Sequence, residues 1–199
     1  MIYERQKELN LNIPKYAAVL GVGGVGSWVS LFLALVGVKK LLLVDPDVIE
    51  EHNLNRTPFR LDQVGEAKAM AAAELIYERR QDIEVLPVVS RENDFVLNEL
   101  KKVEVIVDCR DGEMFFDDPE IQNKVIAKLG YDGVSMTIVP HPKRPSWGED
   151  IVRYTITPSY VVPPVVLAAT AVDMIVREWS PKHTLTFDGL EEVFGVEKE

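Results

Sequence analysis

The chain of 199 residues is long enough for one domain of moderate size, and 47% of its residues are hydrophobic. Its 22 basic and 32 acidic residues give a net charge of −10, which makes nucleic acid an unfavourable partner. Cys109 is the one cysteine, so neither an internal disulfide nor a zinc site of paired cysteines can form. The apolar stretches fall short of the ~20 residues that span a bilayer, and we expect a cytoplasmic protein.

Strand-like and helix-like patterns alternate along most of the chain. Buried-strand patterns lie at residues 16–22, 40–44, 83–89, 103–108 and 133–139. Helical patterns lie between them at residues 27–36, 66–81, 94–101 and 119–129. Continuous apolar strands separated by helices predict a mainly parallel sheet covered on both faces. Right-handed crossovers then favour a doubly wound, Rossmann-like α/β topology.

The pattern changes after residue 139, where a proline-rich loop begins. A C-terminal elaboration follows, with a strand at 151–157, a helix at 165–179 and a strand at 184–187. Because this helix is apolar on most of its surface, it must be buried by a subunit interface or by a second layer of the same domain. We expect a single domain made of an N-terminal arm at 1–15, a core at 16–139, and a loop with the last helix and strand at 140–199.

A glycine-rich loop, Gly21-Val22-Gly23-Gly24-Val25-Gly26, stands between the first strand and the first helix. In this context Gly21 permits a tight turn, Gly23 lets a phosphate approach the backbone, and Gly26 lets strand and helix pack closely. The start of the helix offers unpaired amide groups and partial positive charge to an anion. Nucleotide binding is therefore the expected role of Gly21, Gly23, Gly24 and Gly26.

The next strand ends in Asp45-Pro46-Asp47, and Asp45 lies 19 residues after Gly26. This is the usual offset for a carboxylate that accepts hydrogen bonds from ribose hydroxyls, and Asp47 is expected to lie beside the nucleotide as well. The alternative is an ordinary tight turn followed by an aspartate on the surface.

Three polar residues follow the acidic strand end. Asn53 is followed by two cations, Arg56 and Lys68, which add positive charge where a triphosphate would lie, and a pocket that binds only NAD does not need that charge. Lys68 falls in the first turn of its helix, where a cation opposes the helix dipole, so its position suggests a use other than helix stability. Solvated surface residues are the alternative for Arg56 and Lys68.

These segments resemble the ThiF/MoeB-like adenylyltransferases, the superfamily that includes the ubiquitin-activating enzymes. The resemblance rests on residues 21–27, 44–47, 53–56, 64–68 and 107–111. It implies that ATP lies over the glycine loop with its ribose at Asp45. It also implies that Asn53, Arg56 and Lys68 contact the phosphates, and that Asp111 helps to place Mg²⁺. The implied reaction joins a carboxylate to AMP and releases pyrophosphate. The implied partner is a ubiquitin-like or sulfur-carrier protein ending in Gly-Gly, or a peptide.

The segment Tyr3-Glu4-Arg5-Gln6 resembles a short motif of that family, whose arginine reaches the ATP site of the partner subunit in a dimer. A cation supplied in this way is worth ~10³–10⁵ in rate in phosphoryl transfer. The alternative is an arginine on a frayed amphipathic helix. We expect a homodimer in which Arg5 takes part in catalysis.

The chain departs from the family pattern at several places. It lacks the two Cys-x-x-Cys pairs, and residues 140–160 contain no cysteine that could form a thioester. We therefore expect adenylation without thioester transfer, with Cys109 as a small packed residue. Gly112 and Phe116 stand where the family usually has Asn and Arg, which leaves open a degenerate member.

Other functions stay open at this point. One is a non-catalytic nucleotide-binding scaffold or a partner subunit of the same family. Another is an NAD-dependent oxidoreductase, which would use the same glycines and Asp45 but gives no role to Arg56 and Lys68. A third is a family variant that adenylates a modified tRNA base, which the charge of −10 disfavours.

Overall fold

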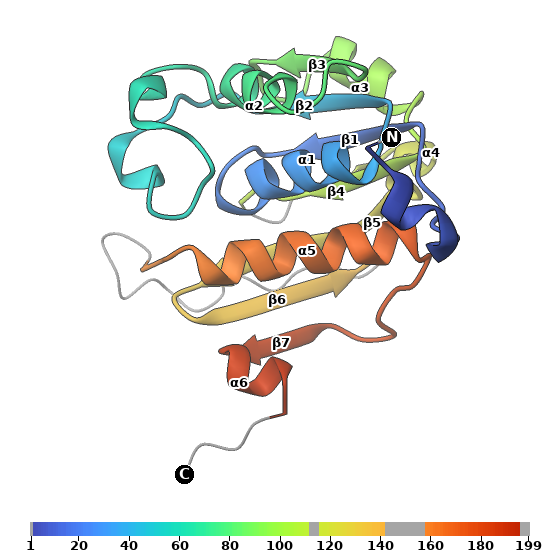
Figure 1. Cartoon of the computed structure of the whole chain (residues 1–199), viewed down its shortest axis with the longest axis vertical. Coiled ribbons are helices and arrows are strands. Elements are labelled where there is room, and N and C mark those ends of the chain that lie inside the picture. The colour runs from blue at the N-terminus through green and yellow to red at the C-terminus, as the bar shows by residue number, and fades with distance from the viewer. Residues whose placement is uncertain (1, 112–115, 142–157, 196–199) are drawn as a thin grey trace.

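The computed structural model describes residues 2–111, 116–141 and 158–195. Within these residues the chain forms one seven-stranded sheet in the order β3-β2-β1-β4-β5-β6-β7 (Figure 1). The strands are β1 Tyr16–Leu20, β2 Lys40–Val44, β3 Glu84–Val88, β4 Val105–Asp108, β5 Val125–Asp132, β6 Ser135–Pro140 and β7 Leu185–Asp188. Strands β1 to β5 pair in parallel, whereas β6 is antiparallel to β5 and β7 is antiparallel to β6.

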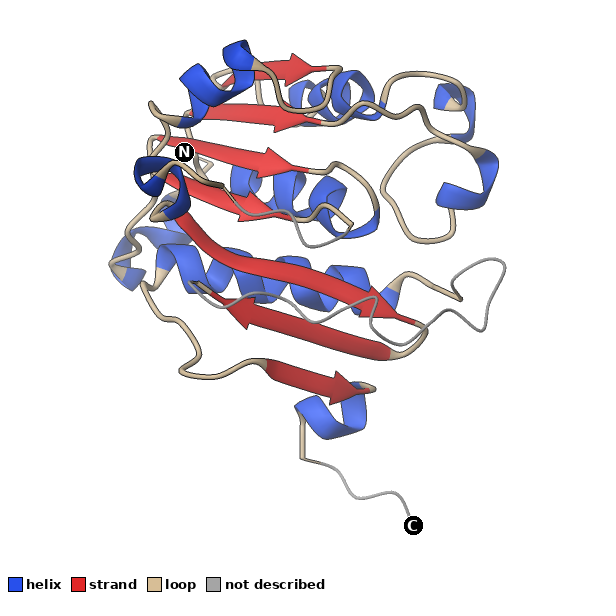
Figure 2. Cartoon of the chain, turned by 180° about the vertical axis from the view of Figure 1, so that it is seen from behind, coloured by secondary structure: helices blue, strands red, loops and turns tan. Residues whose placement is uncertain are grey.

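Helices cover both faces of the sheet, as a doubly wound topology requires. The α-helices are α1 Gly24–Val36, α2 Lys68–Tyr77, α3 Asp94–Leu100, α4 Pro119–Gln122, α5 Val162–Val176 and α6 Leu190–Val193. Short 3₁₀ turns occupy Glu4–Leu9, Glu51–Asn53 and Leu61–Gln63. Figure 2 shows the sheet from the side opposite α1 and α5.

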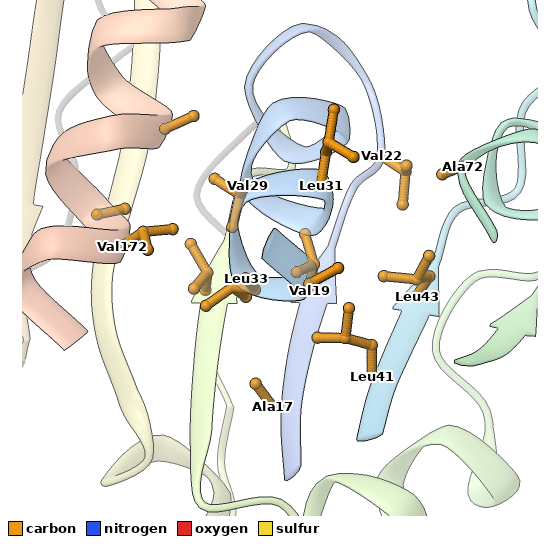
Figure 3. Close-up of a cluster of buried hydrophobic side chains, with 14 of the residues drawn as sticks. Ala17, Val19, Val22, Val29, Leu31, Leu33, Leu41, Leu43, Ala72 and Val172 are labelled. Atoms are coloured by element: carbon orange, nitrogen blue, oxygen red, sulfur yellow. The ribbon is translucent and has the colours of Figure 1, made fainter. Parts of the chain in front are cut away.

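Two apolar clusters hold these layers together. Val19 and Leu41 of the sheet pack with residues of α1, α2 and α5, including Leu33, Ala72 and Val172 (Figure 3). The alternate residues of the same strands face α3 and α4 in the second cluster, which contains Ala18, Leu42, Leu100 and Ile121. Because β1 is buried on both faces, its sequence is continuously apolar and does not alternate.

The strand order reverses between β1 and β4, and this reversal positions the site. After β3 the chain crosses back under the sheet, so that β4 pairs with the other side of β1. In open α/β sheets, ligands bind outside the carboxyl ends of the strands at such a switch point. A ligand site is therefore expected at the loops that follow β1, β2 and β4.

The expected helix at 119–129 is wrong beyond its first turn. Asp118 caps α4 through the amide of Glu120, but α4 ends at Gln122 and β5 begins at Val125. β5 pairs with β4 on one side and forms a hairpin with β6 on the other, through a turn at Gly133 with φ of +57°. This pairing outweighs the helix-like spacing of the segment. The expected strand at 151–157 lies outside the described residues.

The apolar surface of helix α5 was expected to be buried either by a subunit interface or by a second layer of the same domain. The helix packs against α1, β5 and β6, so a second layer of the same domain buries it. It begins at Val162, earlier than expected, because Pro163 and Pro164 are tolerated in the first turn, where the amides have no helical partner. Among the described residues, no helix combines the length and apolar character needed to cross a membrane.

Candidate functional site

The glycine loop leaves β1 and enters α1 by a turn that only small residues permit. Gly21 has φ of +78°, and a Cβ there would lie 2.8 Å from the carbonyl oxygen of Cys109. Its amide donates to the carbonyl of Val44 at 2.8 Å, which ties the turn to β2. A Cβ on Gly26 would lie 1.8 Å from the Gly21 carbonyl oxygen. The tight turn and the close packing predicted for Gly21 and Gly26 are both found.

An added Cβ at Gly23 or Gly24 would not meet the backbone atoms that it meets at Gly21 and Gly26. A Cβ on Gly23 would meet nothing within 4 Å, so the backbone of this helix-capping residue is open to a ligand. A Cβ on Gly24 would lie 2.2 Å from the Tyr131 hydroxyl oxygen. At position 24 the protein's own tyrosine requires the glycine, whereas at position 23 the space beside the backbone is open.

Asp45 is buried beside this loop, with 4% of its surface exposed. Its carboxylate accepts from the amide of Val22 at 2.6 Å and from the amide of Asp47 at 2.8 Å. Burial raises the pKa of Asp45, and the two amides and Lys68 oppose that rise. The alternative of a surface aspartate is thus excluded. Each carboxylate oxygen keeps a lone pair for a further donor such as a ribose hydroxyl.

Lys68 is the first residue of α2, and only 14% of its side chain is exposed. Its ammonium lies 3.1 Å from the Asp47 carboxylate and also acts electrostatically on Asp45. A bridge between Val48 and Ala67 holds this end of α2 next to the strand end. The side chain is therefore directed toward the acidic end of β2 and is not a freely solvated lysine.

The segment from Asn53 to Thr57 is fixed by local hydrogen bonds. Asn53 is buried, and its side-chain oxygen accepts from the amide of Glu50 at 3.0 Å. Its side-chain amide hydrogens remain available to donate to a ligand. The Arg56 guanidinium donates to the side-chain oxygen of Asn55 at 3.0 Å. The main-chain carbonyl of Arg56 accepts from the indole of Trp28 on α1 at 3.0 Å. Arg56 thus sits above the first turns of α1.

Sequence reasoning missed Tyr131, which lies near the end of β5. Its side chain is half-buried, and it interacts with Arg56 and Ser159 by hydrogen bonds. The residue fell just past a segment taken for a helix, so nothing in the pattern connected it with the glycine loop. Its place at this edge depends on the β4–β5 pairing.

A buried charge cluster stands at the end of β4 and beside it in the middle of β5. Asp108 is 2% exposed and accepts from the Arg110 guanidinium at two distances of 2.9 Å. The ammonium of Lys128 lies 3.4 Å from the same carboxylate, and Glu92 pairs with Arg110. Burial raises the pKa of Asp108, lowers that of Lys128, and lowers the pKa of Arg110 to about 10. Sequence reasoning also missed Lys128, because its segment was assigned to a helix and was not placed beside β4.

Two expectations concern the residues that follow this cluster. Asp111 is exposed after β4, and Gly112 lies outside the described residues. Phe116 is buried, with the Arg110 guanidinium 5.0 Å from its ring centre. The described residues contain no group of acidic, histidine or cysteine side chains able to hold a metal by themselves. Asp111 fits a Mg²⁺ that arrives with phosphate ligands, which commonly keeps only one or two carboxylates from the protein.

Cys109 and Arg5 lie in different surroundings. Cys109 packs against the core beside the glycine loop, and burial raises the pKa of its thiol. Arg5 is exposed on the 3₁₀ turn Glu4–Leu9, where Gln6 donates to the carbonyl of Val36 at 2.7 Å. Val36 ends α1, whose 13 residues span about 20 Å from the glycine loop. Figure 1 also places the N-terminus at the other end of the sheet, so Arg5 does not reach the site of its own chain.

Comparisons with known proteins agree with this geometry. Ubiquitin-like modifier-activating enzyme 5 of Arabidopsis thaliana is 41% identical over 81 residues, which cover 41% of this chain and 17% of that protein. The SAMP-activating enzyme E1 of Haloferax volcanii is 38% identical over 95 residues, covering 47% of this chain and 35% of that protein. The matched region is thus about a third or less of these relatives' own length.

Among solved structures, E. coli MccB with ATP has a TM-score of 0.62 and 23% identity, covering 84% of this chain and 57% of that chain. This likeness shows the shared fold. A family model described as the ThiF family matches residues 6–140, which include the glycine loop, both acidic strand ends and Tyr131. The chain therefore belongs to the ThiF family.

Proposed function

We propose that this protein binds ATP and Mg²⁺ and transfers AMP to a carboxylate, releasing pyrophosphate. The observation that carries the proposal is the pairing of Lys68 with the acidic end of β2. A nucleotide pocket needs Asp45 for the ribose and the open backbone at Gly23 for a phosphate group, and both are present. The half-buried ammonium next to them adds a cation where a polyphosphate chain would continue.

The proposed reaction makes few demands on acid–base chemistry. A substrate carboxylate oxygen attacks the α-phosphorus, and the bond to the bridging oxygen of pyrophosphate breaks. The protein has to align the two reactants and stabilise the charge that develops on the leaving group. In our proposal Asp45 holds the ribose, the amides from Gly23 onward face the phosphates, and Arg56 and Lys68 bind the leaving group. Mg²⁺ near Asp111 would neutralise further charge on it.

The names of the relatives support a proposal for the substrate class. Proteins similar to this chain are named as activating enzymes for ubiquitin-like modifiers and for SAMP, and MccB has been crystallised with MccA. We propose that the substrate here is the C-terminal carboxylate of a ubiquitin-like or sulfur-carrier protein ending in Gly-Gly, or of a peptide. Consumption of ATP suits the cytoplasmic location expected from the sequence.

We further propose that the protein acts as a homodimer. Arg5 is exposed and lies about one helix length from its own glycine loop, so it can serve a phosphate site only in another copy. A closed dimer with two equivalent sites would supply that arginine in both directions.

Pyrophosphate–ATP exchange with Mg²⁺ tests the proposal, with and without a candidate protein ending in Gly-Gly. Lys68→Ala should lower the exchange rate by about 10²–10³. Lys39→Ala is the matched control, because Lys39 also pairs with an aspartate, Asp82, but its side chain is 59% exposed. ATP binding without exchange would point to a scaffold, and a preference for NAD over ATP would point to an oxidoreductase.

A further inference from the structure

Tyr131 joins three segments that are distant in the sequence. It extends from β5, interacts by hydrogen bonds with Arg56 in the loop after β2, and does the same with Ser159 just before α5. The Asn55 side-chain amide donates to the carbonyl of Ser159 at 3.0 Å, which closes the connection between the two loops.

The hydroxyl group of Tyr131 lies against the first residue of α1. A Cβ placed on Gly24 would be 2.2 Å from the hydroxyl oxygen and 3.0 Å from the carbon that carries it. The absence of a side chain at position 24 thus leaves the space that the phenol group occupies. This contact fixes the hydroxyl at the end of the helix where an anion would bind.

The chemistry of the pair sets the direction of its hydrogen bond. An arginine has donors and no acceptor, so the Tyr131 oxygen accepts from the guanidinium of Arg56. The indole of Trp28 holds the backbone of Arg56 from the α1 side at 3.0 Å. With its main chain and its side chain both held, the guanidinium is limited to few orientations.

We propose that Tyr131 is a positioning residue, which holds the Arg56 guanidinium over the first turn of α1 for the β- and γ-phosphates of ATP. This inference rests on the proposed function. It extends that function to a residue of β5 and to the contact with Gly24. Loss of the hydroxyl should leave the ring packed in place and remove one of the contacts that orient the guanidinium, which would then keep its contacts with Asn55 and the carbonyl of His52. Binding of the outer phosphates should therefore weaken most.

The test compares Tyr131→Phe with Tyr77→Phe in the whole protein. Tyr77 is the matched control, because its hydroxyl accepts from the amide of Val85 at 3.1 Å, between α2 and β3. Dissociation constants for ATP and for AMP are measured with Mg²⁺, together with melting temperatures and pyrophosphate exchange. We expect Tyr131→Phe to weaken ATP binding by about tenfold to a hundredfold, the range for a hydrogen bond to a charged group. AMP, which lacks the outer phosphates, should bind almost as before.

Arg56→Ala and the double variant separate positioning from folding. In the Arg56→Ala background, Tyr131→Phe should change ATP affinity by less than about twofold, because the group it positions is gone. Equal losses for ATP and AMP, or additive losses in the double variant, would overturn the inference. If the wild type exchanges pyrophosphate and Tyr131→Phe behaves like Tyr77→Phe, the inference fails while the proposed function stands. A wild type that does not bind ATP overturns both.

Discussion

Replacement of Gly26 by alanine tests the geometry of the glycine loop directly. The new Cβ would stand 1.8 Å from the carbonyl oxygen of Gly21 and 3.3 Å from the Cβ of Cys109. The Gly21 oxygen belongs to the backbone and cannot rotate away as a flexible side chain would. The amide of the same residue is held by Val44 at 2.8 Å, so the loop must move as a unit.

The expected cost follows from these distances. Overpacking in well-packed regions costs ~1–3 kcal/mol, and a backbone contact of this kind belongs at the upper end. Alanine has a higher helix propensity than glycine, which stabilises α1 by up to ~1 kcal/mol. The net decrease in the free energy of unfolding is then about 2 kcal/mol or more. For a domain of this size that corresponds to a fall in Tm of about 4–8 °C.

Gly23→Ala is the matched control in the same loop, since its Cβ would meet nothing within 4 Å. Its free energy of unfolding should stay within about 1 kcal/mol of the wild type, the scale of a changed helix cap. ATP affinity should nevertheless fall, because the methyl group occupies the space open to a phosphate. Thermal and urea unfolding with an ATP titration measure both properties. A Gly26→Ala protein that melts at or above Gly23→Ala would refute the reasoning.

Three further outcomes are expected. In Lys128→Met the charge that lowers the pKa of Asp108 is lost, so this pKa should rise further above its ordinary value. A carboxyl group with a raised folded pKa contributes stability that is lost as pH rises through that folded pKa. The unfolding free energy of the variant should therefore fall relative to wild type as pH rises from the folded pKa of wild-type Asp108, which is itself above the ordinary value, to the higher folded pKa of the variant. A constant difference across that pH range would contradict the burial of the pair. The Cys109 thiol should react with a disulfide reagent at least about tenfold more slowly in the native protein than in urea, as its raised pKa requires, and equal rates would show that it is accessible. Arg5→Ala and Lys68→Ala proteins should each be nearly inactive in pyrophosphate exchange, whereas their mixture should regain about one working site per hetero-pair, and an inactive mixture would exclude action of Arg5 across an interface.

Much of the nucleotide half of the site was predictable from local sequence. The turn at Gly21, the close packing at Gly26 and the carboxylate of Asp45 all depend on one strand, one turn and the neighbouring strand. The burial of Asp45 beside Val22 agrees with its expected place next to the glycine loop, whereas the pairing of Lys68 with Asp47 was not predicted. The contacts of these residues with a bound nucleotide stay predictions.

Other parts of the site were not predictable in this way. The spacing of residues 119–129 favours a helix, yet the pairing of β5 with β4 and β6 makes most of it a strand. With that error, Lys128 and Tyr131 could not be assigned to the carboxyl edge of the sheet. Gly24 matched the loop motif, but the pattern did not reveal that Tyr131 is what requires a glycine there.

The amino-acid sequence alone determined the class of fold, the glycine loop and the acid that follows it. These features are encoded by hydrophobic periodicity and by residues a few positions apart, so local geometry suffices to read them. Only the tertiary structure decided that α5 is covered within the same domain, that Asp108 is neutralised by Arg110 and Lys128, and that Tyr131 meets Arg56 over α1. Those contacts join residues far apart in the chain, and they form because strand pairing and core packing bring separate loops to one edge of the sheet.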